Sequence, residues 1–356
     1  MVSCLNMTNV TQAGADQFNI TAECALFDFS VYTIIVGSLT VLGIVGNIIS
    51  FSVLWKDSSK SATAFLLRSL AVADSLVLMV AVPLYAIAPI YPFTDYLKYF
   101  YSIYPNLIPY LWPFFQIPYT GTILLTVLVS LNRYFAVCKP FKSAKMCSTV
   151  QAKKHVIYVA LFSIVYNIPR FFEYEKVEIC TGYNQTSLVF QQGGAFGNNL
   201  VYRIIYANIL YFLVMHGGPL ISLSFLNYKL IIALKKRQRR RAEMGKGGYQ
   251  QDITLVLVVV IFVFIFCQTP TFIDHILWTA VDPQLRQCPN WHYYYTAIGD
   301  MLAILNSSVN FLIYILTSRK FRQLLKTGCV PSPELMRLQS DKADMTLLSQ
   351  AVNNAS

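Results

Sequence analysis

The sequence predicts an all-α membrane protein, a bundle of seven transmembrane helices followed by a short amphipathic eighth helix. Of the 356 residues, 55% are hydrophobic and only 13% are charged, about half the charged fraction of a soluble domain. The apolar residues gather in uncharged runs near the roughly 20 residues that a helix needs to cross a bilayer. The basic residues gather between alternate runs. This composition excludes a disordered chain and disfavours both a soluble enzyme and a nucleic-acid-binding protein.

Seven runs qualify as spans. In chain order they cover residues 30–55, 69–91, 103–132, 155–169, 204–226, 253–273 and 293–317. The fourth is short, so we expect its neighbours to complete it. Asp74 and Asp300 are the only charged residues inside the second and seventh runs. The Pro and Gly residues inside the runs are tolerated in packed membrane helices.

Most of the 28 Lys and Arg residues lie in the loops after the first, third and fifth runs and in the C-terminal tail. The positive-inside rule places these segments in the cytoplasm, and seven crossings then put the N-terminus on the outer side of the membrane. Residues 1–29 lack both a basic start and an apolar core, so no cleaved signal peptide is expected. Four glycosylation acceptors fall on the predicted outer side. They are Asn6, Asn9, Asn19 and Asn184.

The predicted organisation is an outer glycosylated N-terminus (1–29), the bundle (30–317), an amphipathic helix (318–329) and a cytoplasmic tail (330–356). In the helix, Phe321, Leu324 and Leu325 share one face of a basic segment, which favours a position on the inner leaflet. Cys329 follows directly, as a palmitoylation site or a plain thiol. Four cysteines lie on the outer side, and their three pairings stay open. They are Cys4, Cys24, Cys180 and Cys288.

Polar residues inside the spans are candidates for function, because each is costly in lipid. Asp74 fits either a structural hydrogen-bond node or an ion site. One helical face of the third span carries a stripe that ends in a guanidinium. It consists of Phe115, Tyr119, Thr122, Thr126, Val129 and Arg133. In the seventh span Asn306 and Asn310 share a face, for which Asp74 is the obvious partner. Motifs for phosphate, zinc, redox or nucleophilic catalysis are absent, so no enzyme is expected.

Several short motifs together resemble rhodopsin-like (class A) G-protein-coupled receptors over about residues 30–329. They are Leu70-Ala71-Val72-Ala73-Asp74, Asn132-Arg133-Tyr134, Pro219, Cys267-Gln268-Thr269-Pro270, and the segment NFLIY (310–314) followed by Phe321. The segments 166–175 (YNIPRFFEYE) and 132–141 (NRYFAVCKPF) are most similar to invertebrate FMRFamide-type neuropeptide receptors. The resemblance implies a seven-helix bundle that binds a small amidated extracellular peptide and acts on a heterotrimeric G protein.

The sequence departs from the family pattern at several positions. Asn132 replaces the Asp before the arginine, Gln268 replaces the sixth-span Trp, and Asn227 replaces the fifth-span Tyr. Phe311 replaces the seventh-span Pro, so a weaker kink is expected there. No cysteine lies between Cys24 and Cys138, which excludes the family's common disulfide at the top of the third span.

Two ligand subclasses are excluded by the same comparison. An opsin needs a lysine where this chain has Ile304, and an amine receptor needs an aspartate where it has Phe115. A peptide ligand fits better.

The resemblance also implies the roles of particular residues. G-protein coupling is expected at Asn132, Arg133, Tyr134 and Tyr314. A sodium site is expected at Asp74, Thr122, Asn306, Ser307 and Asn310, and no cofactor apart from this allosteric Na⁺. In this fold the outer ends of the first and seventh helices are neighbours, which favours a Cys24–Cys288 disulfide. Cys180 is then left for Cys4 or as a thiol.

For a peptide ending in Arg-Phe-amide, Asp300 is the predicted partner of the cation, with Asp274, Glu173 and Glu175 as alternatives at the rim. Phe115, Tyr119 and Phe272 form a predicted aromatic wall for the ring. Gln116 or Gln268 would pair with the amide, since each can donate and accept. Asp300 also fits a purely structural pair with a neighbouring helix.

Two alternatives remain at this stage. A seven-span ion or proton transporter would use Asp74, Asp300 and His216 as a relay. An orphan receptor would have a different ligand, or none. Arg133-Tyr134 beside a basic third cytoplasmic loop favours the receptor, because a carrier has no need for it.

Overall fold

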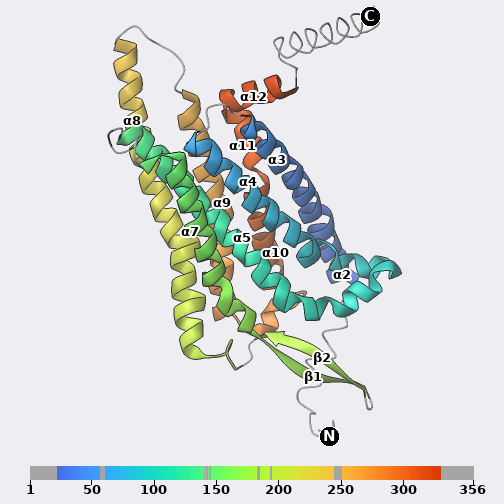
Figure 1. Ribbon diagram of the computed structural model, residues 1–356. Helices are drawn as coiled ribbons and strands as arrows, with labels where there is room; N and C mark the ends of the chain where they lie inside the picture. The colour runs from blue at the N-terminus through green and yellow to red at the C-terminus, as the bar shows by residue number, and fades with distance from the viewer. Residues whose placement is uncertain are drawn as a thin grey trace, which may run out of the picture.

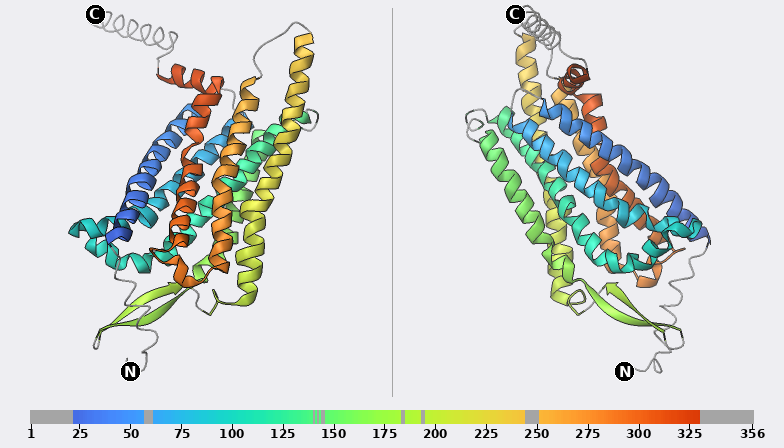
Figure 2. Two further views of the ribbon diagram at one scale, coloured as in Figure 1. Left: turned by 180° about the vertical axis from the view of Figure 1, so that it is seen from behind. Right: turned by 45° about the vertical axis from the view of Figure 1, so that its right-hand side comes forward.

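The computed structural model describes residues 22–56, 61–139, 141, 143, 146–182, 185–192, 195–243 and 251–329. Long helices run side by side as a bundle, with a β-hairpin at one end and a short helix lying across the other (Figures 1 and 2). We call the end next to the hairpin the outer end and the opposite end the inner end, following the predicted orientation. The predicted glycosylation acceptors, Cys4 and the tail lie outside the described residues.

The first four spans are built from continuous or nearly continuous helical segments. The first comprises α2 (Ala22–Asp28), η3 (Phe29–Val36) and α3 (Gly37–Trp55). The second comprises α4 (Ala62–Ala81) and η4 (Val82–Ala86), and the short turns η5 (Ala88–Phe93) and η6 (Asp95–Leu97) follow it. The third is α5 (Lys98–Cys138), and the fourth is α7 (Thr149–Asn167) with η7 (Ile168–Phe172).

An antiparallel hairpin, β1 (Tyr174–Gly182) and β2 (Gln185–Gln192), connects the fourth and fifth spans. The fifth span comprises η8 (Tyr202–Leu210), η9 (Phe212–Gly217) and α8 (Gly218–Glu243). The sixth is α9 (Gln251–Ala280), followed by η10 (Pro283–Arg286). The seventh is the pair α10 (Trp291–Ser308) and α11 (Asn310–Thr317), and α12 (Arg319–Cys329) is the eighth helix.

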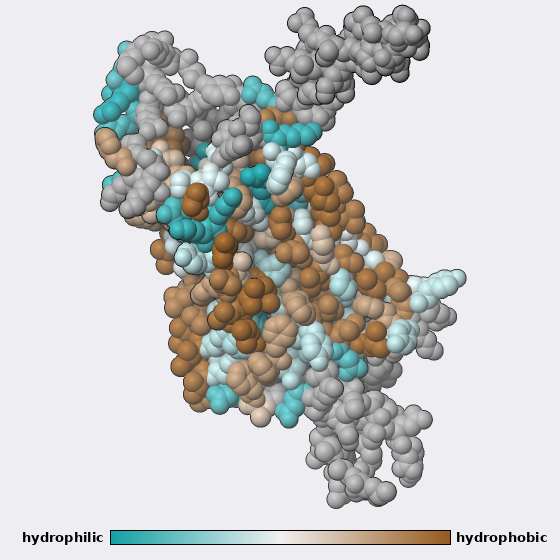
Figure 3. All heavy atoms as spheres, viewed as in Figure 1, coloured by the Kyte–Doolittle hydropathy of each residue, from teal (hydrophilic) through white to brown (hydrophobic). Residues whose placement is uncertain are grey.

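Length and composition support the membrane assignment. Within the described residues, five helices are long and apolar enough to cross a bilayer, the bent pair α10 and α11 gives a sixth, and α9 contains the shorter apolar stretch Phe262–Trp278. Brown, apolar residues cover much of the outward surface of the bundle in Figure 3. Leu42, Ile221 and Leu316 are among the exposed large apolar side chains of the described residues. An apolar surface of this extent on long apolar helices is typical of a bundle that faces lipid.

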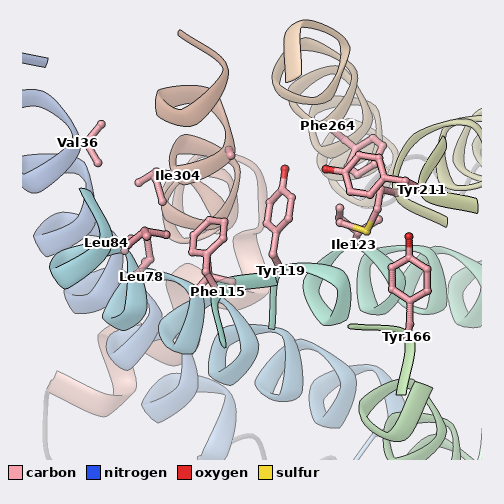
Figure 4. Close-up of a cluster of buried hydrophobic side chains, with 14 of the residues drawn as sticks. Val36, Leu78, Leu84, Phe115, Tyr119, Ile123, Tyr166, Tyr211, Phe264 and Ile304 are labelled. Carbon is pink, nitrogen blue, oxygen red and sulfur yellow. The ribbon is translucent and has the colours of Figure 1, made fainter. Parts of the chain in front are cut away.

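Two helices begin at a serine whose hydroxyl caps the first turn. Ser61 accepts a hydrogen bond from the amide of Ala64 at the start of α4, and Ser148 accepts one from Gln151 at the start of α7. Each serine occupies the N-cap position, where its side chain satisfies an otherwise unpaired backbone N–H. The core that these helices enclose contains Phe115, Tyr119 and Ile304, which Figure 4 shows among neighbouring apolar side chains.

Close packing of the first and seventh spans depends on two glycines. A Cβ atom on Gly43 would lie 2.5 Å from Ser308 Oγ, and one on Gly46 would lie 2.8 Å from Phe311 Cβ. Small residues let membrane helices approach this closely. Phe311, which stands where the family has proline, therefore has a specific place against Gly46.

The expectation of a weaker kink at this position is wrong, because α10 and α11 meet at an angle of 48°. The side-chain amide of Asn47 donates to the carbonyl oxygen of Ser307 at 3.0 Å, just before the break at Val309. A side chain inserted into the helical hydrogen-bond ladder is a known cause of kinks. A hydrogen bond from the first span thus accompanies the bend in the absence of proline.

Several helix boundaries differ from the predicted ones. The first helix begins at Ala22 and not at Ser30, and the third begins at Lys98 and not at Ile103. The all-α prediction also missed the hairpin, whose register pairs Val177 with Val189. The alternation of Val177 and Ile179 with charged residues in the first strand was the available signal.

Candidate functional site

At the inner end, α5 presents the predicted coupling residues. Asn132 is buried, and its side-chain oxygen accepts a hydrogen bond from the Thr63 hydroxyl of α4 at 3.1 Å. The backbone oxygen of Asn132 accepts from the Cys147 thiol, whose pKa is raised by burial. Among the described residues, no carboxylate lies within ion-pair distance of Arg133. The guanidinium therefore stays without an acidic partner, as the replacement of Asp by Asn had predicted.

Tyr314 closes this region from the seventh span. It is buried, lies within electrostatic range of both Arg133 and Asp74, and packs against Phe321 of α12 with ring centroids 5.7 Å apart. Phe321 also packs against Phe311. The eighth helix is thereby fixed to the inner end of the seventh. Cys329 ends α12, and its side chain lies outside the described residues.

In the middle of the bundle, Asp74 is buried beside the bend of the seventh span. Its Oδ2 accepts a hydrogen bond from Asn310 Nδ2 at 2.7 Å, and Ser307 lies close by. By hydrogen-bond geometry Asp74 Oδ1 and Ser307 Oγ have no partner among the described residues, although the Ser307 hydroxyl is close enough to interact with the Asp74 carboxylate. A buried carboxylate oxygen left in this way favours a proton or a cation.

The structure brings together only part of the predicted ion site. The Thr122 hydroxyl donates to the Tyr119 carbonyl in its own helix, and Asn306 makes no hydrogen bond to Asp74 within the described part of the chain. Asn47 also lies at this site, because its amide donates to the backbone oxygen of Ser307. Its side-chain oxygen is buried and unpaired, and the sequence analysis did not include it. An amide inside the uncharged first run was the available signal.

In the outer half, Asp300 lies between the first, second and seventh spans. Its Oδ2 accepts from the Tyr32 hydroxyl at 3.2 Å, and its Oδ1 accepts from the Tyr85 hydroxyl at 3.1 Å. The two tyrosine rings are stacked, with centroids 5.8 Å apart. No Lys, Arg or His among the described residues lies within ion-pair distance of Asp300. Two neutral phenols hold this carboxylate, and sequence reasoning identified neither.

The predicted aromatic wall is only partly continuous. Phe115 packs edge-on against Tyr85 at 5.7 Å and stacks with Tyr119 at 5.6 Å, in the cluster that Figure 4 shows. Phe272 instead packs against Phe212 and His216 of η9. No ring contact joins Phe272 to Phe115 or Tyr119 among the described residues, so its place in the aromatic wall stays a prediction.

The two candidate amide partners differ in what they already bind. Gln268 and the Tyr119 hydroxyl hydrogen bond to each other, with Nε2 3.0 Å from the hydroxyl oxygen. Gln116 is buried, and its side-chain oxygen has no partner among the described residues. Because an unpaired buried acceptor gains most from a new donor, Gln116 is the better placed of the two.

The alternative acids occupy different environments. Asp274 accepts from the Thr296 hydroxyl at 2.8 Å and lies 3.5 Å from the Nε2 atom of the fully buried His292. Glu175 is exposed and accepts from the amide of Ala195. Both remain near the outer end.

Glu173, expected at the rim, is in fact buried in an ion pair with Arg170 at 3.4 Å. Tyr202 donates a further hydrogen bond to Glu173 at 2.5 Å. Arg170 also donates to the side-chain oxygen of Asn167 and lies over the ring of Tyr211. Through Tyr202 and Tyr211 this ion pair connects the fourth span to the fifth. Because its charge is already paired, Glu173 is not available for a ligand cation.

The outer end is closed by a covalent link between the first and seventh spans. Cys24 and Cys288 form a disulfide, with Cα atoms 6.1 Å apart, which is the pairing that the resemblance implied. Tyr293 adds a hydrogen bond from its hydroxyl to the carboxylate of Asp28. Cys180 lies in β1 opposite Thr186, and its side chain is not among those that the structure describes.

Comparison with known proteins accounts for this arrangement. The family model "7 transmembrane receptor (rhodopsin family)" matches residues 46–314. An FMRFamide receptor of Drosophila melanogaster is 28% identical over 97% of this chain and 61% of its own length. The FMRFamide peptide receptor frpr-18 of Caenorhabditis elegans is 26% identical over 82% of this chain and 68% of its own, and mouse neuromedin-U receptor 2 is 25% identical over 84% and 75%.

The chain thus spans about three fifths of the length of the Drosophila relative. The matched family model covers well over half of the chain, from the first span to the inner end of the seventh. The chain belongs to the rhodopsin family of seven-transmembrane receptors, which are not enzymes.

Proposed function

We propose that this protein is a plasma-membrane receptor for a small amidated peptide of the FMRFamide type, with its N-terminus outside the cell. Peptide binding at the outer half activates a heterotrimeric G protein at the inner end through Asn132, Arg133, Tyr134 and Tyr314. The names of two relatives support the ligand class, since both are FMRFamide receptors. Family membership removes the basis for the transporter relay through Asp74, Asp300 and His216.

The observation that carries the ligand class is the environment of Asp300. Its two oxygens are oriented by Tyr32 and Tyr85, and no cation among the described residues balances its charge. Both phenols are neutral donors, so they stabilise the carboxylate without neutralising it. An arginine side chain of the ligand supplies the missing charge. Phe115 and Tyr119 are nearby partners for a ring, and Gln116 is one for a carboxamide.

A peptide screen tests the proposal directly. Cells that express the receptor with an N-terminal epitope, detected without permeabilisation, are exposed to amidated peptides while calcium and cAMP are recorded. Peptides ending in Arg-Phe-amide should activate, and their free-acid forms should be much weaker. Silence across the panel, with the epitope detected at the surface, would favour the orphan alternative.

Asp300→Asn then tests the charge pair. In this variant the binding free energy of the arginine peptide should weaken by about 2 kcal/mol or more, which is about a 30-fold loss of affinity. An analogue with citrulline in place of arginine should lose far less. Tyr85→Phe is the matched control, because it removes one hydrogen bond and keeps the carboxylate. Equal losses for the two peptides on Asp300→Asn would assign Asp300 a structural role.

A second proposal concerns an allosteric Na⁺ at Asp74, with ligands drawn from Ser307, Asn310, Thr122 and Asn306. The unpaired Asp74 Oδ1 and Ser307 Oγ support it. Sodium that binds the resting state better than the active state would lower agonist affinity. Affinity measured in sodium chloride should therefore be lower than in the chloride of a large organic cation, and Asp74→Asn should abolish the difference. Identical affinities in the two salts for the unmodified receptor would count against the site.

A further inference from the structure

The segment that leads into the third span is unusually aromatic. Between residues 88 and 115, eleven positions hold Tyr, Phe or Trp, and only Asp95 and Lys98 carry charge. The chain as a whole is 14% aromatic, so these rings are concentrated about threefold here. The peptide-binding and coupling sites described above use only Phe115 of this segment.

The segment extends sideways from the bundle. Figures 1 and 2 show η5, η6 and the outer part of α5 passing beyond α2 and the outer end of α3, at about the level of α2. Helix α5 has 41 residues, which is about 60 Å of helix against about 30 Å of hydrocarbon. It contains Pro105, Pro109, Pro113 and Pro118. Each removes a backbone N–H, which permits the helix to bend.

Five side chains of this segment stay largely exposed, and we call them the aromatic rim. Phe93 is 51% exposed, Tyr96 96%, Tyr99 77%, Tyr110 52% and Phe114 55%. Phe93, Tyr96 and Tyr99 follow one another at three-residue spacing at the entry to α5, and Tyr110 and Phe114 share one face of α5 at a spacing of four residues. The exposed rings are thus concentrated within residues 93–114.

Contacts on its other side hold the segment in place. Phe93 packs against Phe29 of η3 with ring centroids 4.7 Å apart, and the Tyr104 hydroxyl donates to the carbonyl of Leu84. Phe114 packs edge-on against Phe171 of η7 at 5.6 Å. The segment thus touches the first, second and fourth spans at their outer ends.

We propose that the aromatic rim lies in the outer-leaflet interface of the lipid bilayer, at the boundary between acyl chains and headgroups. Tyrosine combines an apolar ring with a polar hydroxyl and is enriched at this boundary. The first span, which the segment contacts through Phe93 and Phe29, also exposes apolar side chains, among them Ile34 and Leu42. The scarcity of charge fits a lipid partner better than a surface facing water. The rim fixes the depth of α5, which carries Phe115, Tyr119 and Arg133.

Depth-dependent fluorescence quenching tests this placement on the full receptor in phospholipid nanodiscs. Tyr96→Trp and Tyr99→Trp place reporters in the rim, with Phe93→Trp as a third, and the emission of the parent protein is subtracted. Gln287→Trp, on the exposed loop before the seventh span, is the aqueous control. Leu42→Trp is the lipid control. Tryptophan for tyrosine preserves an amphipathic ring, and gel filtration checks that each variant is folded.

Phospholipid with a doxyl group at carbon 5 should quench the rim reporters about twofold or more above Gln287→Trp. Aqueous iodide should quench them correspondingly less than Gln287→Trp. Leu42→Trp should respond to the lipid quencher alone. If the rim tryptophans were quenched to the same extent as Gln287→Trp by both quenchers, the proposal would be overturned. The segment would then lie in water, with a peptide or protein as its partner. The outcome is independent of which ligand the receptor binds.

Discussion

Asn132 accepts a hydrogen bond from Thr63, and the adjacent Arg133 has no acidic partner among the described residues. An aspartate in place of Asn132 would add a negative charge beside the guanidinium. The present amide keeps the link between α5 and α4 but removes that attraction. Asn132, where the family has Asp, therefore changes the electrostatics of the inner end without changing its packing. We expect the basal signalling activity of this receptor to be raised as a result.

Substitutions at Asn132 and Arg133 should separate their effects on basal and on agonist-driven signalling. Asn132→Asp should lower agonist-independent nucleotide exchange about fivefold, as expected if the added carboxylate stabilises the resting state by about 1 kcal/mol. Arg133→Ala should abolish agonist-driven exchange while surface expression is unchanged. Binding of a non-hydrolysable GTP analogue to membranes measures both, with Asn132→Gln as the neutral control. Normal agonist-driven exchange in Arg133→Ala would contradict the assigned role.

Residue-level prediction worked where a polar group stands out within an apolar run. Asp74, Asp300 and Asn310 were recognisable from sequence because each is costly in lipid. The partners Tyr32 and Tyr85 were not, because tyrosines are common in these runs and the phenols come from other helices. Glu173 was misassigned to the rim because its burial depends on Tyr202 of the fifth span, although its ion-pair partner Arg170 is only three residues away in sequence.

At the scale of elements, the number and order of the spans could be predicted, because apolar length alone decides them. Their ends could not. Helix α2 continues the first span outward, where Cys288 and Tyr293 hold it. The bend of the seventh span is likewise invisible in its own sequence, since the hydrogen bond at its break comes from Asn47.

The contact between Gly46 and Phe311 gives a test at this scale. Gly46→Leu should lower stability by about 1–3 kcal/mol, because its Cβ would overlap the Phe311 side chain. Adding Phe311→Ala should restore part of the loss by opening space. The matched control is Gly37→Ala, whose Cβ would meet Ala86 Cβ at 3.8 Å, an ordinary contact. Thermal unfolding of the purified receptor measures all three, and an equal loss in Gly37→Ala would remove the steric explanation.

At the scale of the whole molecule, the two ends of the bundle are held by different means. The inner end relies on packing of Tyr314, Phe321 and Phe311. The outer end relies on the Cys24–Cys288 disulfide, which joins residues 264 apart in sequence, and on the Asp28–Tyr293 hydrogen bond. The Arg170–Glu173 pair adds a link on the opposite side of that end. In a chain without the family's usual disulfide, the Cys24–Cys288 bond, which we call the clasp, is the covalent cross-link among the described residues.

Removing the clasp should therefore loosen the outer end more than the inner end. Cys24→Ser, Cys288→Ser and the double variant should each lower stability by about 2–4 kcal/mol, because all three lose the same cross-link. They should also weaken peptide binding, since α2 and η3 position Tyr32 beside Asp300. Tyr293→Phe, which removes only the hydrogen bond to Asp28, should cost about 1 kcal/mol. Mass spectrometry of a non-reduced digest should recover the two cysteine peptides joined. Finding Cys24 as a thiol or bonded elsewhere would contradict the clasp, and so would a double variant that unfolds at the temperature of the parent receptor.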